Sequence, residues 1–223
     1  MQEKMTGRLH LFLRQNVVFY LAGFLIICAF RHAFWEATSD GLDWLLYPTA
    51  RWVQWIGGIP FERAPGAGYV NHHLRFIIAA PCSGIRFMMI TFSALLFSFV
   101  HRFGAKTQKS AWAALSLGLS YLFTIVVNGV RMILALGYPA PAFGYGWAAP
   151  EKYHMLQGMS VYLLSLFAIY QIADHATGKR GASRRGKSGG GVLAGAARAC
   201  AAPVFWYLLF MLAIPALNRW LWG

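Results

Sequence analysis

Five long apolar stretches constrain this chain more than any other feature of its sequence. They cover residues 17–35, 76–100, 111–137, 154–172 and 203–222. A helix needs about 20 mostly apolar residues to cross the hydrocarbon core of a bilayer. Apolar residues make up 58% of the chain and charged residues only 12%, whereas a soluble domain carries about 25% charged residues. The sequence therefore predicts an all-α membrane protein, a polytopic helical bundle of about five transmembrane spans, and excludes a disordered chain.

A sixth apolar stretch, residues 42–60, is interrupted by Asp43, Pro48 and Arg51 and holds three tryptophans. Indole side chains favour the membrane–water interface. We therefore expect a helix that lies on the membrane surface. A sixth span here would move the basic loop 101–109 to the outer side of the membrane.

The basic residues predict the orientation of the spans. Twelve of the twenty Lys and Arg residues, but only two of the seven acidic residues, fall in segments 1–15, 101–109 and 174–198. With five spans these segments share one side, which the positive-inside rule assigns to the cytoplasm. We expect a multi-pass plasma (inner) membrane protein with its N-terminus in the cytoplasm. The first span is expected to be retained, because no convincing small-x-small cleavage site follows it.

Three polar islands interrupt the apolar spans, and the predicted topology puts all of them near the outer face. They are Pro81-Cys82-Ser83-Gly84-Ile85-Arg86, Asn128-Gly129-Val130-Arg131 and His154-Met155-Leu156-Gln157-Gly158. Cys82 follows a proline where the chain turns into a helix, and the unpaired N–H groups of a helix N-terminus favour a thiolate. An imidazole such as His154 can protonate a leaving amine. Arg131 keeps its charge and suits an oxyanion.

These residue types together indicate acyl transfer through a thioester. Each also has a structural interpretation. A cysteine in an apolar helix is often a small hydrophobic side chain. Arg131 could extend to the membrane surface, and His154 could be an interfacial residue. Arg86 could support the thiolate of Cys82, or pair with a carbonyl group or with Asn128. An arginine within an apolar span nevertheless costs at least about 2.5 kcal/mol and usually marks a functional site.

The ordered motifs Cys82-Ser83-Gly84, Asn128-x-x-Arg131 and His154-x-x-x-Gly158 resemble those of the exosortase/archaeosortase family of membrane cysteine transpeptidases. The match covers residues 81–158. The resemblance implies that Cys82 is the nucleophile, His154 the acid/base and Arg131 the transition-state stabiliser. Ser83, Gly84, Arg86, Asn128 and Gly158 are then expected to support the site or bind substrate.

The resemblance also implies partners and a domain organisation. The substrates are exported proteins that end in a short motif, a hydrophobic helix and a basic cluster, and an amine of unknown identity accepts them. With few spans before Cys82 and no appended soluble domain, the chain is similar to short, exosortase-K-like members. We expect a catalytic membrane domain over residues 1–173, a basic cytoplasmic linker over 174–202 and a last span within 203–223.

Other signals carry less weight. Residues 181–188 fit the phosphate-loop pattern, but they lie in an Arg/Gly linker without the strand that this motif requires. We therefore predict no nucleotide binding, and we interpret the net charge of +13 as a sign of topology and lipid contact, not of nucleic-acid binding. His72 and His73 are weak alternatives for a base or a metal ligand, and we expect no metal and no cofactor. The rival function is a small transporter or lipid-handling protein in which Arg86, Asn128 and Arg131 line a polar path.

Overall fold

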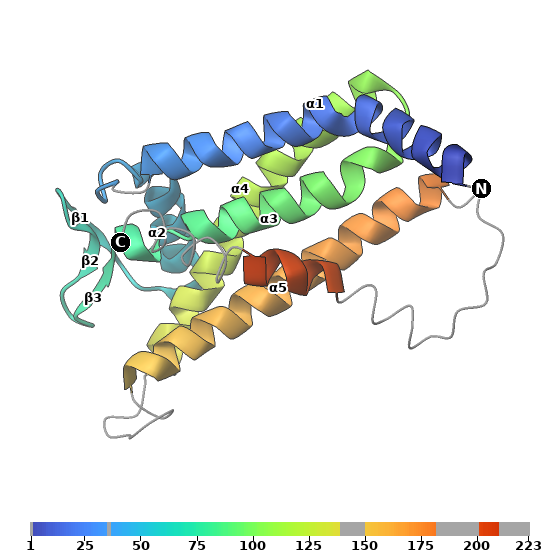
Figure 1. The fold of residues 1–223 in the computed structure, drawn as a ribbon. Coiled ribbons are helices and arrows are strands. Elements are labelled where there is room, and N and C mark those ends of the chain that lie inside the picture. The colour runs from blue at the N-terminus through green and yellow to red at the C-terminus, as the bar shows by residue number, and fades with distance from the viewer. Residues whose placement is uncertain (1, 35–36, 139–149, 182–200, 210–223) are drawn as a thin grey trace. The chain divides into compact units, whose positions relative to one another are not determined.

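The computed structural model describes residues 2–34, 37–138, 150–181 and 201–209. Its long helices are α1 (Gln2–Phe34), α3 (Ile85–Phe99), α4 (Lys106–Gly137) and α5 (Pro150–Gly181), and Figure 1 follows them from blue to orange. Within the described residues, four segments are long and apolar enough to cross a membrane: Asn16–Phe34, Ala80–Arg102, Lys106–Gly137 and Met155–Gly178. The predicted class, an all-α membrane protein, is confirmed.

Two predicted segments near the C-terminus are described only in part. Helix α5 continues to Gly181, so the predicted linker begins with helical residues. The rest of the linker, residues 182–200, lies outside the described residues, as do residues 210–223 of the predicted last span. Residues 201–208 are helical. The sides of the membrane on which the loops lie remain a prediction.

A helix forms within residues 42–60, as predicted, and a small sheet follows it; the position of this helix on the membrane surface stays a prediction. Helix α2 (Asp43–Gly57) is followed by β1 (Glu62–Ala64), β2 (Gly68–Asn71) and β3 (Phe76–Ile78). The three strands form an antiparallel sheet in the order β1-β2-β3, and β2 packs against α2 (Figure 1). Our prediction that the second span begins at residue 76 was therefore wrong. Residues 76–78 pair with β2 instead, and the helical part of the span begins with a short 3₁₀ turn, η1 (Ala80–Cys82).

The chain divides into two compact units. The first comprises Met1–Arg31, Met89–Leu119 and Ala168–Gly223, and the second comprises His32–Met88 and Ser120–Phe167. The residues that the sequence analysis singled out all belong to the second unit.

The first unit holds charged groups with close partners. The buried Lys109 Nζ donates a hydrogen bond to Asn16 Oδ1 over 2.6 Å. Arg102 bonds both to Asp174 Oδ1 at 2.6 Å and to Thr177 Oγ1 at 2.8 Å. These contacts stabilise cations near the ends of apolar helices, where an unpaired charge would be costly.

In the second unit, an apolar cluster joins α2 to the sheet. It consists of Leu42, Leu46, Ala50, Tyr69 and Ile78. The buried Ser39 ties the surrounding backbone together, since its Oγ donates to the Ala67 carbonyl and accepts from the Ala80 amide, each over 3.1 Å. One hydroxyl thus links the start of α2, the β1–β2 turn and the turn that carries Cys82.

A hydrogen bond from α4 reaches α2 at the point where Pro48 interrupts the backbone hydrogen bonds of α2. Pro48 has no N–H to bond the carbonyl of Trp44, four residues earlier. Tyr121 Oη of α4 donates to that carbonyl over 3.0 Å, and its ring stacks on the Trp44 indole at 5.7 Å. Pro48 is therefore tolerated within α2 because another helix supplies the missing donor.

The geometry of the β1–β2 hairpin predicts that alanine substitutions at its two glycines lower stability by different amounts. Gly66 and Gly68 both have positive φ, at +75° and +110°. A Cβ at Gly68 would collide with the Ile78 carbonyl oxygen, whereas a Cβ at Gly66 would meet nothing within 4 Å. We expect Gly66→Ala to cost about 1 kcal/mol and Gly68→Ala at least about 3 kcal/mol. Thermal unfolding in detergent and tryptic cleavage at Arg63 measure this. Equal effects of the two substitutions would contradict the hairpin geometry.

Candidate functional site

Cys82 ends a tight turn that leads into α3. Its amide donates to the Ala79 carbonyl over 2.8 Å, and the Ser83 amide donates to the Ala80 carbonyl over 3.1 Å. The buried Ser83 Oγ accepts a hydrogen bond from the Ile85 amide, over 3.4 Å, at the first residue of the helix. The predicted turn from Pro81 into a helix is confirmed. The thiol of Cys82 is free and half-buried, and it packs against the apolar cluster.

The side chain of Asn128 fixes this turn to α4. Asn128 is completely buried, so both ends of its amide need partners. Its Nδ2 donates to the Cys82 carbonyl over 2.6 Å, and its Oδ1 accepts from Tyr162 Oη over 2.9 Å. The first and second polar islands therefore meet through a hydrogen bond to the backbone of the candidate nucleophile.

Arg131 lies one turn after Asn128 and joins the same network. Its Nη1 donates to Tyr162 Oη over 3.1 Å, and the guanidinium carbon lies 5.3 Å from the centre of the Tyr162 ring. A guanidinium has five N–H donors, and this hydrogen bond uses one of them. The half-buried Arg131 is thus held from α5 by a neutral hydroxyl group and an aromatic ring.

Two of the predicted glycines allow these close contacts. Gly84 has φ +76°, and a Cβ there would lie 3.3 Å from Asn128 Cγ and 3.0 Å from Thr124 Cγ2. A Cβ at Gly158 would lie 2.7 Å from Arg131 Nε. Since real Cβ atoms do not approach so closely, a side chain at Gly158 would push the guanidinium away. Gly158 brings the third polar island to the other two.

Tyr162 connects Asn128 to Arg131 and was not among the predicted residues. Tyr162 is buried on α5, and its ring stacks on that of Phe87 with centroids 4.5 Å apart and planes at 11°. Its position, one helical turn after Gly158, was the available signal, because residues four apart share a face of a helix. Within an apolar span, however, a tyrosine is easily taken for an interfacial or core aromatic residue.

The remaining predicted residues stand apart from this network or beyond what is described. Arg86 is exposed, and neither Asn128 nor Cys82 hydrogen-bonds to it. His154 is a residue of α5, one turn before Gly158, but its side chain lies outside the described residues. Its predicted role as acid/base therefore stays a prediction.

The weaker signals can be located as well. His72 and His73 are exposed in the turn between β2 and β3. Among the described residues, no three His, Cys, Asp or Glu side chains lie close enough together to hold a metal ion. The phosphate-loop pattern lies outside the described residues, apart from Gly181 at the end of α5.

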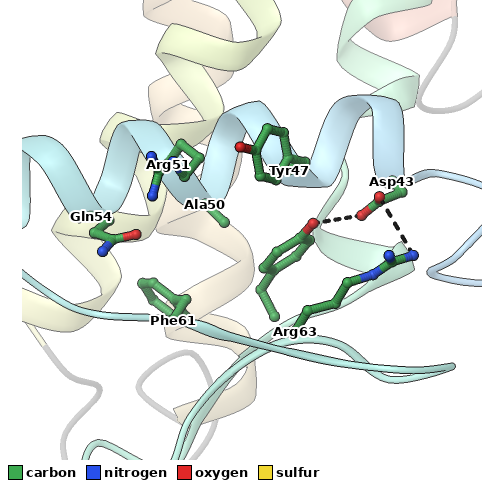
Figure 2. A pocket seen from close by; sticks show the side chains of 8 residues that line it. Asp43, Tyr47, Ala50, Arg51, Gln54, Phe61 and Arg63 are labelled. Atoms are coloured by element: carbon green, nitrogen blue, oxygen red, sulfur yellow. Dashed lines mark hydrogen bonds and ion pairs between the residues drawn. The ribbon is translucent and has the colours of Figure 1, made fainter.

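A pocket of about 400 Å³ opens between α2 and the hairpin, near the apolar cluster. Figure 2 shows Asp43 and Arg63 together at one end of it, and Arg51, Gln54 and Phe61 at the other. Arg63 Nη2 lies 3.6 Å from carboxylate oxygens of both Asp40 and Asp43. This pocket was not predicted, since its lining residues come together only when the hairpin folds against α2.

Tyr69 makes up part of the pocket wall and bonds to its acidic end. Tyr69 Oη donates to Asp43 Oδ1 over 2.7 Å. Burial raises the pKa of Tyr69, and the hydrogen bond and charge of Asp43 raise it further, to about 12. The phenol is protonated at neutral pH and acts as a hydrogen-bond donor.

This raised pKa predicts how stability depends on pH. The free tyrosine pKa is about 10, so the folded state holds the Tyr69 proton more tightly than the unfolded state. The stabilisation is complete below pH 10 and is lost as the pH rises through about 12, because a phenolate would face the Asp43 carboxylate. We expect Tyr69→Phe to lower stability by about 1–2 kcal/mol at neutral pH. The difference in Tm between the two proteins should shrink above pH 10, and a constant difference would contradict this assignment.

The hydrogen-bond network predicts that loss of the Tyr162 hydroxyl group lowers the stability of the protein. Tyr162→Phe removes the donor to Asn128 Oδ1 and leaves a buried acceptor unpaired, which we expect to cost about 1–3 kcal/mol. The same change at the exposed Tyr138 should cost under about 0.5 kcal/mol. Thermal unfolding of both variants in detergent measures the difference. A Tyr162→Phe protein as stable as Tyr138→Phe would show that the buried bond contributes nothing.

Comparisons with protein-family models, with curated proteins and with solved structures gave no match. The functional interpretation therefore rests on the chemistry of the side chains. The described candidate site is a half-buried free thiol, with a buried amide on its carbonyl group and a tyrosine that joins this amide to an arginine.

Proposed function

We propose that this chain is a membrane-embedded cysteine peptidase and transpeptidase of the exosortase/archaeosortase type. It cleaves the C-terminal tails of exported proteins and transfers the cleaved proteins to an amine acceptor. One observation carries the proposal. A continuous chain of hydrogen bonds runs from the Cys82 carbonyl through Asn128 and Tyr162 to Arg131. Residues far apart in the sequence are thereby joined to the backbone of the half-buried Cys82.

In the proposed first step, the Cys82 thiolate attacks the carbonyl carbon of the scissile peptide bond. The electron pair of the carbonyl group moves to its oxygen, and the resulting oxyanion needs hydrogen-bond donors. Arg131 suits this role, because its charge is permanent and its contact with Tyr162 leaves other N–H groups for a ligand. Tyr162 is a positioning residue that holds the guanidinium.

In the second step, the C–N bond breaks and the leaving amine takes a proton, for which we propose His154 as the donor. The substrate is then a thioester on Cys82. An acceptor amine attacks this thioester and gives a proton to His154, the thiolate leaves, and a new amide bond forms. Water in place of the amine would give simple hydrolysis. The low water content near a membrane interface favours the amine.

The proposed substrate is an exported protein with a short motif, a hydrophobic helix and a basic cluster at its C-terminus. The chain has helices long and apolar enough to cross a membrane. The hydrophobic helix of the substrate can lie in the bilayer beside them. The positive-inside distribution of basic residues supports an extracytoplasmic position for Cys82. The chain would then act from the plasma (inner) membrane after its substrate has been exported.

The test compares the two described cysteines. Cys28 is an exposed free cysteine of α1, and Cys82 is half-buried. We expect Cys82→Ala to lower cleavage of a co-expressed tailed protein by at least about 1,000-fold, because the nucleophile is lost. Cys28→Ala should leave cleavage unchanged. Gel mobility and membrane release of the tailed protein measure processing, and a hydroxylamine-labile adduct on Cys82, found by mass spectrometry, identifies the thioester.

Normal tail cleavage by the Cys82→Ala protein would contradict the proposal. The rival function, a transporter or lipid-handling protein in which Arg86, Asn128 and Arg131 line a polar path, predicts that Cys82→Ala changes little. An adduct that resists hydroxylamine would count against a thioester even if Cys82 were essential.

A further inference from the structure

The small antiparallel sheet has two edges, and they differ in charge. Within the described residues, β1 and β3 each pair with β2 alone (Figure 1). An edge strand exposes backbone N–H and C=O groups that can pair with another chain, and proteins commonly protect such edges with charged side chains. The β1 edge has this protection, since Glu62 and Arg63 are exposed. The β3 edge, Phe76-Ile77-Ile78, carries no charge.

The strand register allows a direct comparison of the two edges. Glu62 lies opposite Val70, and Val70 lies opposite Ile77. Side chains directly opposite one another share a face of a sheet, so Glu62 and Ile77 occupy the same row at its two ends. Ile77 is nevertheless 48% exposed. A large apolar side chain on an unprotected edge is typical of a strand that pairs with another chain.

The β3 edge is also less covered than the middle of the sheet. Strand β2 packs against α2, whereas no described helix packs against β3 to the same extent. The sheet is held in place from its other side, because Ser39 Oγ bonds to the Ala67 carbonyl and to the Ala80 amide over 3.1 Å each. The free edge of β3 therefore has a fixed geometry.

The extended backbone of β3 continues towards the candidate nucleophile. Ala79 has φ −113° and ψ 179°, which is an extended conformation. The Cys82 amide donates to the Ala79 carbonyl over 2.8 Å. Three residues separate these Cα atoms, so they lie at most about 11 Å apart. A peptide paired with β3 reaches the thiol within a few residues of the paired segment.

Strand addition suits the proposed reaction. Extended peptides bind edge strands through main-chain hydrogen bonds, and such a peptide has no hydrogen bonds within itself. Its scissile carbonyl group is therefore free for attack by the Cys82 thiolate and for the donors that stabilise the oxyanion.

We infer that the free edge of β3 binds an extended segment of the peptide substrate as a fourth strand and directs this segment towards Cys82. This inference rests on the proposed function for the identity of the peptide as a substrate. Strand pairing itself requires no chemistry at Cys82, so the two can be tested separately.

The binding experiment uses the full chain with Cys82→Ala, purified in detergent, and the capped peptide acetyl-Thr-Val-Thr-Val-Thr-amide. Thr and Val favour strands. A second peptide has the same sequence with every backbone nitrogen methylated, so it has no backbone N–H to donate. Saturation-transfer NMR measures both Kd values. We expect the methylated peptide to bind at least about tenfold more weakly, because strand pairing loses several hydrogen bonds. Contact with detergent or with an apolar surface would instead strengthen on methylation.

Two further variants locate the bound peptide. The photo-crosslinking residue p-benzoylphenylalanine replaces either Ile77 on β3 or Glu62, in the same row on β1. We expect the unmethylated peptide to crosslink at position 77 and not at position 62. In the cleavage assay with a co-expressed tailed protein, Ile77→Lys should lower cleavage at least about tenfold, because a charge on an edge strand disfavours strand addition. The uncharged Ile77→Thr and the matched control Glu62→Lys should keep cleavage.

Equal Kd values for the two peptides, or a crosslink at position 62 instead of 77, would overturn the inference. If Ile77→Lys converts a dimer into a monomer in light scattering, the edge is an interface between copies and the inference is wrong. Unfolding curves show whether Ile77→Lys folds, and the peptide and crosslinking measurements decide the question if it does not. Cys82-dependent cleavage that Ile77→Lys leaves unchanged refutes this inference alone. Peptide binding at position 77 without Cys82-dependent cleavage refutes the proposed function alone.

Discussion

The buried amide of Asn128 is the contact on which the rest of the candidate site depends. Its two hydrogen bonds reach residues 46 and 34 positions away in the sequence, Cys82 and Tyr162. A completely buried amide must keep both partners or pay a desolvation cost of about 1–3 kcal/mol for each lost bond. Asn128 therefore sets the positions of the Cys82 turn and of α5 against α4, and Arg131 follows because it lies on the same helix.

The residue after Asn128 provides the matching contact on α2. A Cβ at Gly129 would collide with the indole ring of Trp52, so the absence of a side chain lets α2 lie close to α4. Neighbouring residues of α4 thus contact α2, the Cys82 turn and α5. The polar island Asn128-Gly129-Val130-Arg131 therefore holds neighbouring segments together. The same short segment carries Arg131, the proposed transition-state stabiliser.

Hydropathy predicted the helical membrane class and the first four spans, because long apolar runs have few other ways to be buried. The polar islands drew attention to Cys82, Asn128, Arg131 and Gly158, since polar or glycine residues in apolar runs are conspicuous. The structure brings these residues together, and their chemical roles stay a proposal. The sheet was missed because strands of three or four residues contain too little alternation to distinguish from the start of a span. Tyr162 and the pocket were missed because their meaning lies in contacts between distant segments, which one sequence does not display.

Two arginines near the described helices differ in their partners, and only one of them keeps the free charge that the proposed function requires. Arg102 bonds to the carboxylate of Asp174 at 2.6 Å, which cancels its charge. Arg131 bonds to a tyrosine hydroxyl, and within the described residues it forms no ion pair. A neutral partner fixes the direction of the guanidinium but leaves its positive charge available. Keeping such a charge in an apolar span costs at least about 2.5 kcal/mol, and an oxyanion that develops beside it during acyl transfer would recover that cost in the transition state.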